Sequence, residues 1–136
     1  MFILNHIKII FFNIIYGKIK KIANIKKNKE IKIDINAVTK FETYKIYNIQ
    51  NARLYTTSVH DTAIILNNEL VPGASFQYRN NKKNQIINGN IFKNIVLKNG
   101  TPRFKKKFSC TIISLLTGGA GKTNYFHWMF DVLPRL

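Results

Sequence analysis

Cysteine is almost missing from this chain of 136 residues, and the shortage bears on its compartment. A single cysteine, Cys110, cannot form an intrachain disulfide, so we expect a reducing compartment and a cytoplasmic protein. Cys110 lies in an apolar run and has no flanking base. We therefore interpret it as a small buried apolar residue and not as a nucleophile.

A long hydrophobic run is also missing. After Lys8 the longest uncharged stretch near the N-terminus is IIFFNIIYG, far short of the ~20 residues of a spanning helix. The segment lacks the basic start and the small-residue cleavage site of a secretory signal. Apolar residues instead follow helical spacing, at positions 3, 7, 10, 11, 14 and 15.

Residues 1–30 are therefore predicted to form a basic amphipathic helix and a connector, of which the lysine-rich part, 17–30, is expected to be solvated. Such a helix either lies on an anionic membrane surface or packs on the rest of the fold. The sequence leaves both alternatives open.

Arginine is scarce although the chain is strongly basic. The formal net charge is +16, yet only 4 of the 22 basic residues are Arg, the residue that binds phosphates and bases bidentately. The 18 Lys accompany 22 Ile and 17 Asn, which share A/T-rich codons, so codon composition can supply much of the charge. We therefore expect no nucleic-acid partner. A basic protein that binds nucleic acid or a membrane surface without enzymatic activity is the alternative function.

A glycine is absent where a nucleotide-binding P-loop would need it. The stretch GGAGKT resembles the end of G-x-x-x-x-G-K-[ST], but the first position of that motif is Leu116. Gly118 and Gly119 begin the loop two residues late, which leaves it too short to surround a phosphate. They are also typical of a tight turn from a strand, in the apolar run that begins at Cys110, to a helix.

Short segments of strand character precede this turn. They are predicted at 31–35, 48–55, 62–66, 69–71 and 91–97. Asn67 and Asn68 tolerate positive φ and predict a hairpin turn. Residues 79–90 are polar and are expected to form a surface loop. With the last third as one βα unit, the pattern indicates an α/β protein.

The final stretch, NYFHWMFDVLPRL, contains the chemistry-bearing residues. On a helix Asn124, His127 and Asp131 share one stripe, with Asn124 suited to the N-cap and Pro134 ending the helix. A carboxylate that accepts from one imidazole nitrogen leaves the other free as a base for a hydroxyl nucleophile. A buried structural hydrogen bond between His127 and Asp131 is the competing interpretation.

Residues 114–136 strongly resemble the signature of family-61 glycosyltransferases, whose bacterial members are often labelled capsular polysaccharide biosynthesis proteins. The pattern N-x-x-H-x-x-x-D followed by L-P appears here as Asn124, His127, Asp131, Leu133 and Pro134. Residues 121–123 depart from the family by mimicking a P-loop, which we interpret as loop variation.

The resemblance implies an inverting transfer from a nucleotide sugar to a glycan acceptor, with no cofactor beyond the donor substrate. We nominate no metal-binding residue, and the sequence leaves a metal requirement open. It implies a GT-B fold, in which residues 31–136 form an incomplete, Rossmann-like N-terminal domain on the acceptor side and the donor-binding domain is missing. We thus expect a truncated portion of a longer protein, inactive in isolation. The implied catalytic residues are His127 and Asp131, and the implied substrate-binding residues are Asn124, Gly118 and Gly119.

Overall fold

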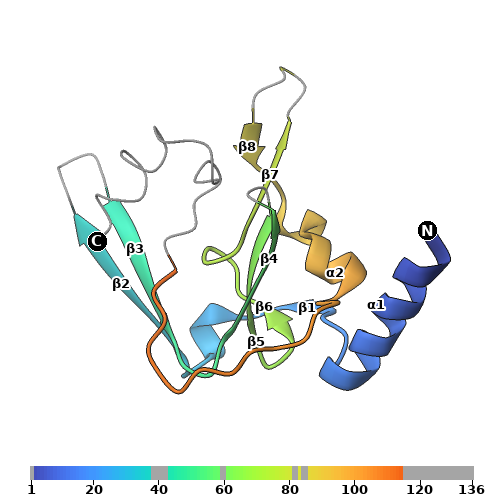
Figure 1. Ribbon diagram of the computed structural model, residues 1–136. Helices are drawn as coiled ribbons and strands as arrows, with labels where there is room; N and C mark the ends of the chain where they lie inside the picture. Colours follow the sequence, from blue (N-terminus) through green and yellow to red (C-terminus); the bar gives the residue numbers. More distant parts are fainter. Residues whose placement is uncertain (1, 38–42, 59–60, 81–82, 84–85, 115–136) are drawn as a thin grey trace.

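The structure, a computed structural model, describes residues 2–37, 43–58, 61–80, 83 and 86–114. Within these residues the chain is a mixed α/β protein, which confirms the predicted class at this level (Figure 1). The helices are α1 (Phe2–Tyr16), η1 (Ile25–Lys27), η2 (Ile91–Lys93) and α2 (Ile95–Asn99). The strands are β1 (Lys21–Ile22), β2 (Ile31–Ala37), β3 (Thr43–Ile49), β4 (Arg53–Ser58), β5 (Asp61–Leu66), β6 (Glu69–Leu70), β7 (Phe76–Asn80) and β8 (Ile86–Asn88).

Strand β5 is the centre of the larger sheet. It pairs antiparallel with β4, β6 and β7, while β1 joins β6 in parallel and β8 joins β7 antiparallel. Successive side chains of a strand point to opposite faces. Ala63 and Ile65 accordingly enter one core cluster, and Leu66 enters a second, with Ile64 packed against it. The strand predicted at 62–66 is confirmed, and it is buried on both faces.

The segment 17–30 is not a solvated connector along its whole length. Ile19 is fully buried and Ala23 is 3% exposed, each in one of the two core clusters. Strand β1 lies between them and pairs with β6, and the amide of Ala23 donates to the carbonyl of Leu70 at 2.9 Å. Lys18, Lys20 and Lys21 remain exposed while Ile19 and Ala23 pack, so the charge of this segment does not prevent its apolar residues from entering the core.

Two turns rest on asparagine in the left-handed region. Asn67 and Asn68, at φ values of 49° and 60°, connect β5 to β6 and confirm the predicted hairpin. Asn51, at φ 55°, lies in the turn between β3, which ends at Ile49, and β4, which begins at Arg53. The single strand predicted over 48–55 is therefore wrong. Asn51 breaks the strand because asparagine accepts turn geometry that β-branched residues avoid.

The strand predicted over 91–97 is also wrong, because this segment forms η2 and α2. Asn90 and Asn94 act as N-caps, with side chains that accept from the amides of Phe92 and Val96. Gly100, at φ 62°, ends α2, and its amide donates to the carbonyl of Val96. The two caps and the glycine pair backbone amides and a carbonyl that a helix leaves unpaired at its ends. Helices this short would not be stable alone.

The region expected to be a surface loop, 79–90, contributes instead to the hairpin of β7 and β8. Tyr78 is in register with Asn88, and Arg79 with Ile87. Gln77 Nε2 donates to the side chain of Asn88 at 2.9 Å, so polar side chains hold this pair together. A prediction based on hydrophobic alternation misses such a strand.

The predicted strand from Cys110 is not formed within residues 110–114, and Cys110 itself is exposed and not buried. Residues 103–114 pair with no strand of the described chain, and their side chains are exposed. A strand is stable only where a neighbour satisfies its backbone groups, so the apolar composition of this run does not suffice.

Strands β2 and β3 form a separate antiparallel ribbon, in register from Ile31 opposite Ile49 to Ala37 opposite Thr43. The ribbon leaves the main sheet at its base, where Ile31 is buried and the amide of Gln50 donates to the carbonyl of Glu30 (Figure 1). The strand predicted at 31–35 is confirmed as part of β2.

Candidate functional site

The residues that the sequence nominates for chemistry all lie in the segment 115–136, outside the described residues. They are Gly118, Gly119, Asn124, His127 and Asp131. Their placement relative to one another is therefore untested, and the predicted catalytic pair stays a prediction.

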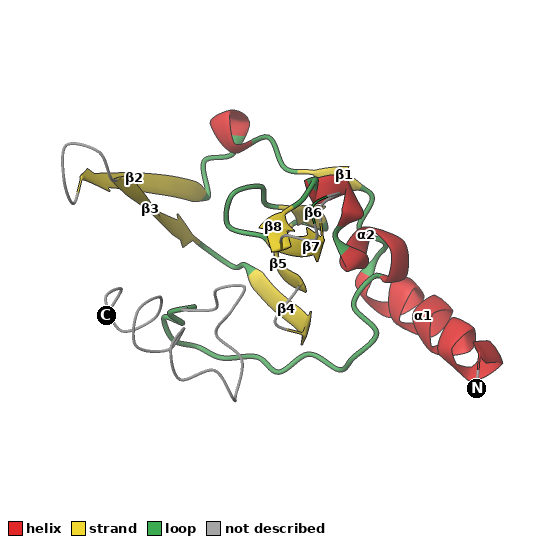
Figure 2. Cartoon of the chain, turned by 90° about the horizontal axis from the view of Figure 1, so that it is seen from above, coloured by secondary structure: helices red, strands yellow, loops and turns green. Residues whose placement is uncertain are grey.

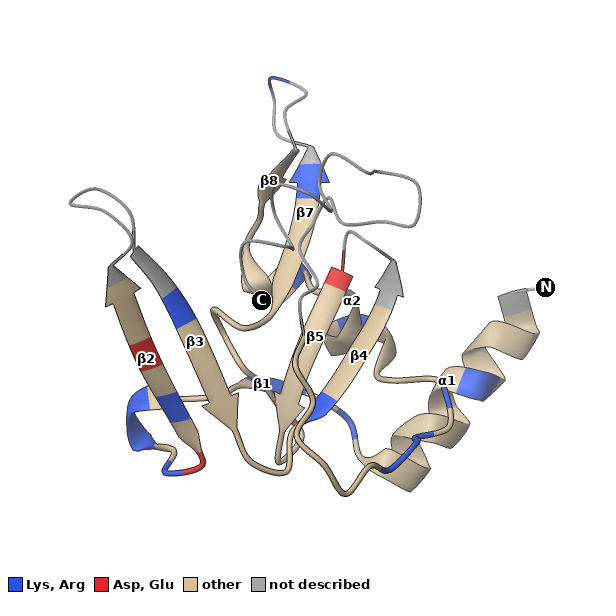
Figure 3. Cartoon of the chain, turned by 60° about the vertical axis from the view of Figure 1, so that its left-hand side comes forward, with Lys and Arg blue, Asp and Glu red and all other residues tan. Residues whose placement is uncertain are grey.

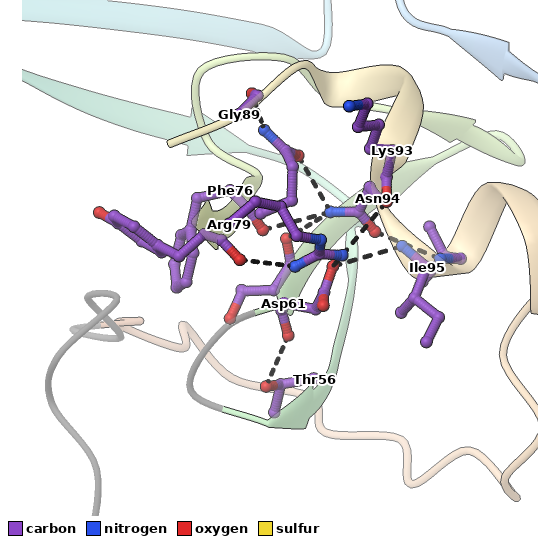
Figure 4. A network of polar contacts seen from close by, with 12 residues as sticks. Thr56, Asp61, Phe76, Arg79, Gly89, Lys93, Asn94 and Ile95 are labelled. Carbon is purple, nitrogen blue, oxygen red and sulfur yellow. Dashed lines mark hydrogen bonds and ion pairs between the residues drawn. The ribbon is translucent and has the colours of Figure 1, made fainter. Parts of the chain in front are cut away.

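The described chain contains a buried polar network around Asp61, on the first residue of β5 (Figure 4). Oδ1 of Asp61 accepts from Arg79 Nη2 at 2.9 Å and from the amide of Ile95 at 3.3 Å. The side-chain amide of Asn94 donates to the carbonyls of Thr62 and Phe76, at 3.2 and 3.3 Å. The contacts of Asn94 and Ile95 join the start of α2 to the sheet, and the Arg79–Asp61 pair joins β7 to β5. The network therefore positions α2, and its function is structural.

A hollow of about 310 Å³ between α1, β4 and the segment after α2 has a different character. It is lined by Asn5, Lys8, Ile9, Tyr55, Asn99, Pro102 and Arg103. None of these residues is acidic, and two of them, Lys8 and Arg103, are basic. The hollow is thus suited to an anion, such as a phosphate.

Tyr55 and Arg103 form one wall of this hollow. The guanidinium carbon of Arg103 lies 5.8 Å from the centre of the Tyr55 ring, and Arg103 Nη1 donates to the carbonyl of Thr56 at 3.4 Å. Burial raises the pKa of Tyr55, and the positive charge of Arg103 partly offsets that rise. Tyr55 is therefore a neutral phenol at physiological pH and a hydrogen-bond donor.

A second set of cations lies beside the same wall. Nζ of Lys105 lies 4.1 Å from the centre of the Tyr16 ring, and the amide of Lys105 donates to Tyr16 Oη at 3.2 Å. Burial lowers the pKa of Lys105, and repulsion from Arg53 and Lys107 lowers it further. Mutual repulsion without a neighbouring carboxylate is the electrostatic signature of a site that favours an anionic ligand.

Arg53, at the start of β4, adds to the positive electrostatic potential around Lys105. Its Nη2 donates to Oδ1 of Asn68 at 3.2 Å, whereas its Nη1 is buried with no hydrogen-bond partner among the described residues. Burial lowers the pKa of Arg53, and the nearby Tyr16 partly offsets the effect. Sequence reasoning missed this cluster because its cations come from three distant segments, and only the signal of a short basic run at 103–107 was visible.

A second hollow, of about 420 Å³, lies beside η1. It is lined by Asn24, Lys27, Asn28, Lys29, Glu30 and Glu69. Glu30 is engaged there by the side-chain amide of Asn67 at 2.9 Å. Both signs of charge are present, and within the described residues no group of His, Cys, Asp and Glu could hold a metal ion. The lining of this hollow therefore does not indicate a class of ligand.

Comparison of the chain with protein-family models, with curated proteins and with solved structures gives no match. Among the described helices, none is both long enough and apolar enough to cross a membrane.

Proposed function

We propose that this chain belongs to an inverting, nucleotide-sugar-dependent glycosyltransferase similar to family 61, acting in surface or capsular polysaccharide biosynthesis. The observation that supports the proposal is the pattern Asn124-x-x-His127-x-x-x-Asp131 followed by Leu133-Pro134. The pattern combines a base, its orienting partner and an amide at helical spacing. It is more specific than the glycines that precede it.

The proposed reaction is one displacement at the anomeric carbon of the donor sugar. The acceptor hydroxyl oxygen forms a bond to that carbon as the bond to the diphosphate breaks, and the nucleoside diphosphate leaves with the electron pair. The hydroxyl proton passes to His127 or Asp131, with the other residue orienting the base. Asn124 binds a substrate hydroxyl, and Gly118 and Gly119 let the backbone approach the substrate closely.

At the level of fold, the proposal assigns residues 31–136 to the acceptor-side domain of a GT-B transferase, with a Rossmann-like core. The mixed α/β architecture is compatible with that assignment. The donor diphosphate is assigned to a second domain that these residues do not form, near a helix N-terminus.

The test is an assay of the protein, produced from its gene with any sequence that follows Leu136, against a panel of nucleotide sugars. Release of nucleoside diphosphate is measured with and without glycan acceptors. We expect His127→Ala or Asp131→Asn to lower kcat by about 100-fold or more, because the base is lost.

The matched controls are His6→Ala on α1 and Asp34→Asn on β2, which change the same residue types elsewhere. Both are expected to retain normal turnover. Normal turnover of both His127→Ala and Asp131→Asn in a folded, active protein would give this pair a structural role only. Absence of donor turnover across the panel would contradict the transferase itself.

A further inference from the structure

Helix α1 turns its apolar stripe away from the rest of the fold. At 100° per residue, seven large side chains fall within one arc of about 140°. Each is 49–79% exposed, and they are Ile3, Leu4, Ile7, Ile10, Phe11, Ile14 and Ile15. No polar residue interrupts the arc. In a helix of a globular protein this stripe normally faces the core, so α1 is oriented the opposite way.

The inner side of α1 is held by aromatic contacts. Phe12 is 5% exposed, stacks on Tyr16 with ring centres 5.7 Å apart, and meets Phe104 edge to face at 5.0 Å. Phe104 belongs to the segment after α2, so α1 is fixed from a distant part of the chain. The exposed stripe is thus not required for attaching the helix, and Figure 2 shows α1 projecting from the periphery of the molecule.

The segment that holds α1 is itself basic and aromatic. Residues 103–108 read RFKKKF, and Phe104 and Phe108 are 77% and 63% exposed. Lys105 covers the ring of Tyr16, which brings this segment against the C-terminal half of α1 (Figure 3). The basic and aromatic segment therefore lies on the inner side of α1, against Phe12 and Tyr16, and the apolar stripe faces away from it.

The two segments that carry this charge contain no acidic residue of their own. Residues 1–29 and 99–114 contain no Asp or Glu. Lys8 lies at the edge of the apolar arc, one turn from Leu4, and also lines the anion-suited hollow with Arg103. Lys8 thus borders the stripe, Arg103 and Lys105 lie on the inner side of α1, and these two segments contain no carboxylate to pair with them.

The length of α1 fixes how it can meet a bilayer. Its 15 residues extend about 22 Å, which is less than the roughly 30 Å of a hydrocarbon core. The helix can lie along the interface with its stripe among the acyl chains and its lysines at the headgroups.

We propose that α1 and residues 103–108 together bind the surface of an anionic phospholipid bilayer, with Lys8, Arg103 and Lys105 contacting lipid phosphates. Charge complementarity favours this occupant, because the arc is entirely aliphatic and aromatic, Lys8 lies at its edge, and Arg103 and Lys105 lie on the other side of the helix. Cations on the polar side of such a stripe are typical of helices that lie in the membrane interface. The proposal goes beyond the transferase reaction and does not depend on it.

The test is flotation of the purified chain with vesicles on a density gradient, in which aggregated protein sediments and bound protein rises. Vesicles of phosphatidylcholine are compared with vesicles that contain about one-third phosphatidylglycerol. We expect flotation with the anionic vesicles only, and loss of flotation as salt rises.

The first variant is Ile7→Gln with Ile14→Gln, since Gln preserves helix propensity at exposed positions. Its affinity for anionic vesicles is expected to fall about tenfold or more, because two side chains no longer enter the acyl region. The matched control is Phe92→Gln with Ile113→Gln, two positions that are 72% and 74% exposed outside α1. It is expected to float as the wild type does.

The second variant is Lys8→Gln with Lys105→Gln, compared with Lys26→Gln and Lys27→Gln on η1, which lies away from α1 (Figure 2). We expect roughly a fivefold loss for each lysine removed near the bilayer and a smaller loss for the η1 pair. Flotation of the Ile7→Gln and Ile14→Gln protein at the wild-type level would overturn the proposal. A wild-type dimer that this variant converts to a monomer, with no vesicle binding by either, would assign the stripe to a second copy and also overturn it.

Discussion

Strand β5 and helix α1 are both rich in isoleucine, yet they bury it to opposite extents. Ile65 on β5 is 2% exposed, whereas Ile14 on α1 is 79% exposed. The strand has neighbours along both edges and apolar clusters on both faces. The helix has contacts on its inner side only. The hydrophobicity of a residue therefore does not decide its burial; the elements available to cover it do.

The two regions also differ in the burial and hydrogen bonding of their polar side chains. Next to β5, Asp61 and Asn94 are buried and each makes several hydrogen bonds. Beside α1, the cations of residues 103–107 remain near one another without a carboxylate in their segment. We therefore expect the first region to contribute most of the stability and the second to attract anions.

The largest contrast between the regions is expected for apolar truncation. Leu70→Ala, beside β5, should reduce the free energy of unfolding by about 2–5 kcal/mol, because the side chain is fully buried and its loss leaves a cavity. Ile14→Ala on α1 should change it by less than about 0.5 kcal/mol in the absence of lipid. Urea unfolding followed by circular dichroism measures both, and equal losses would show that α1 is covered in solution.

A smaller contrast is expected for asparagine. Asn94→Ala removes the cap of α2 and leaves buried carbonyls of Thr62 and Phe76 without their donor, so it should cost about 1–3 kcal/mol. Asn5→Ala on exposed α1 should be neutral or slightly stabilising, because Ala is the better helix former. The same unfolding assay compares the two variants. An unchanged free energy of unfolding in Asn94→Ala would show that the network does not stabilise the fold.

The turn that separates β3 from β4 gives a test of backbone strain alone. Asn51 has φ 55° and an exposed side chain. Asn51→Ala should destabilise the protein by about 1 kcal/mol, whereas Asn51→Gly should be nearly neutral, since Gly adopts this conformation without a Cβ clash. A higher unfolding temperature for Asn51→Ala than for Asn51→Gly would contradict the turn assignment.

The smallest effect concerns the cations beside α1. The folded-state pKa of Lys105 lies below its ordinary value of 10.5. At pH values between these two pKa values the folded protein therefore binds fewer protons than the unfolded chain. The penalty is complete at lower pH and disappears as pH rises through 10.5, so stability relative to Lys105→Gln should increase with pH. Because the group is largely exposed, the increase should stay below about 0.5 kcal/mol. Stability that falls over this range, measured by urea unfolding, would contradict it.

Local chemistry was predictable where a few adjacent residues decide the structure. The hairpin at Asn67–Asn68, the helix near the N-terminus and the strand at 62–66 each follow from such signals. Predictions failed where a local pattern was ambiguous. The run 91–97 has the apolar content of a strand, but Asn90 and Asn94 cap two short helices there and Gly100 ends the second.

The candidate sites divide in the same way. The pattern of Asn124, His127 and Asp131 is contiguous in sequence, and it could be recognised there without any structure. The basic hollow could not be recognised, because Lys8, Tyr55 and Arg103 are brought together only by the packing of α1 and the 103–108 segment against β4.

By itself, then, the sequence determined the mixed α/β class, the helical stripe near the N-terminus and the local turns, since these depend on neighbouring residues and on side-chain periodicity. Only the tertiary structure decided that Ile19 is buried while Ile14 is exposed, and that the stripe of α1 faces outward while Lys105 lies against the inner side of the helix. The physical reason is that periodicity defines a face but not its partner: burial depends on which distant segments fold against that face.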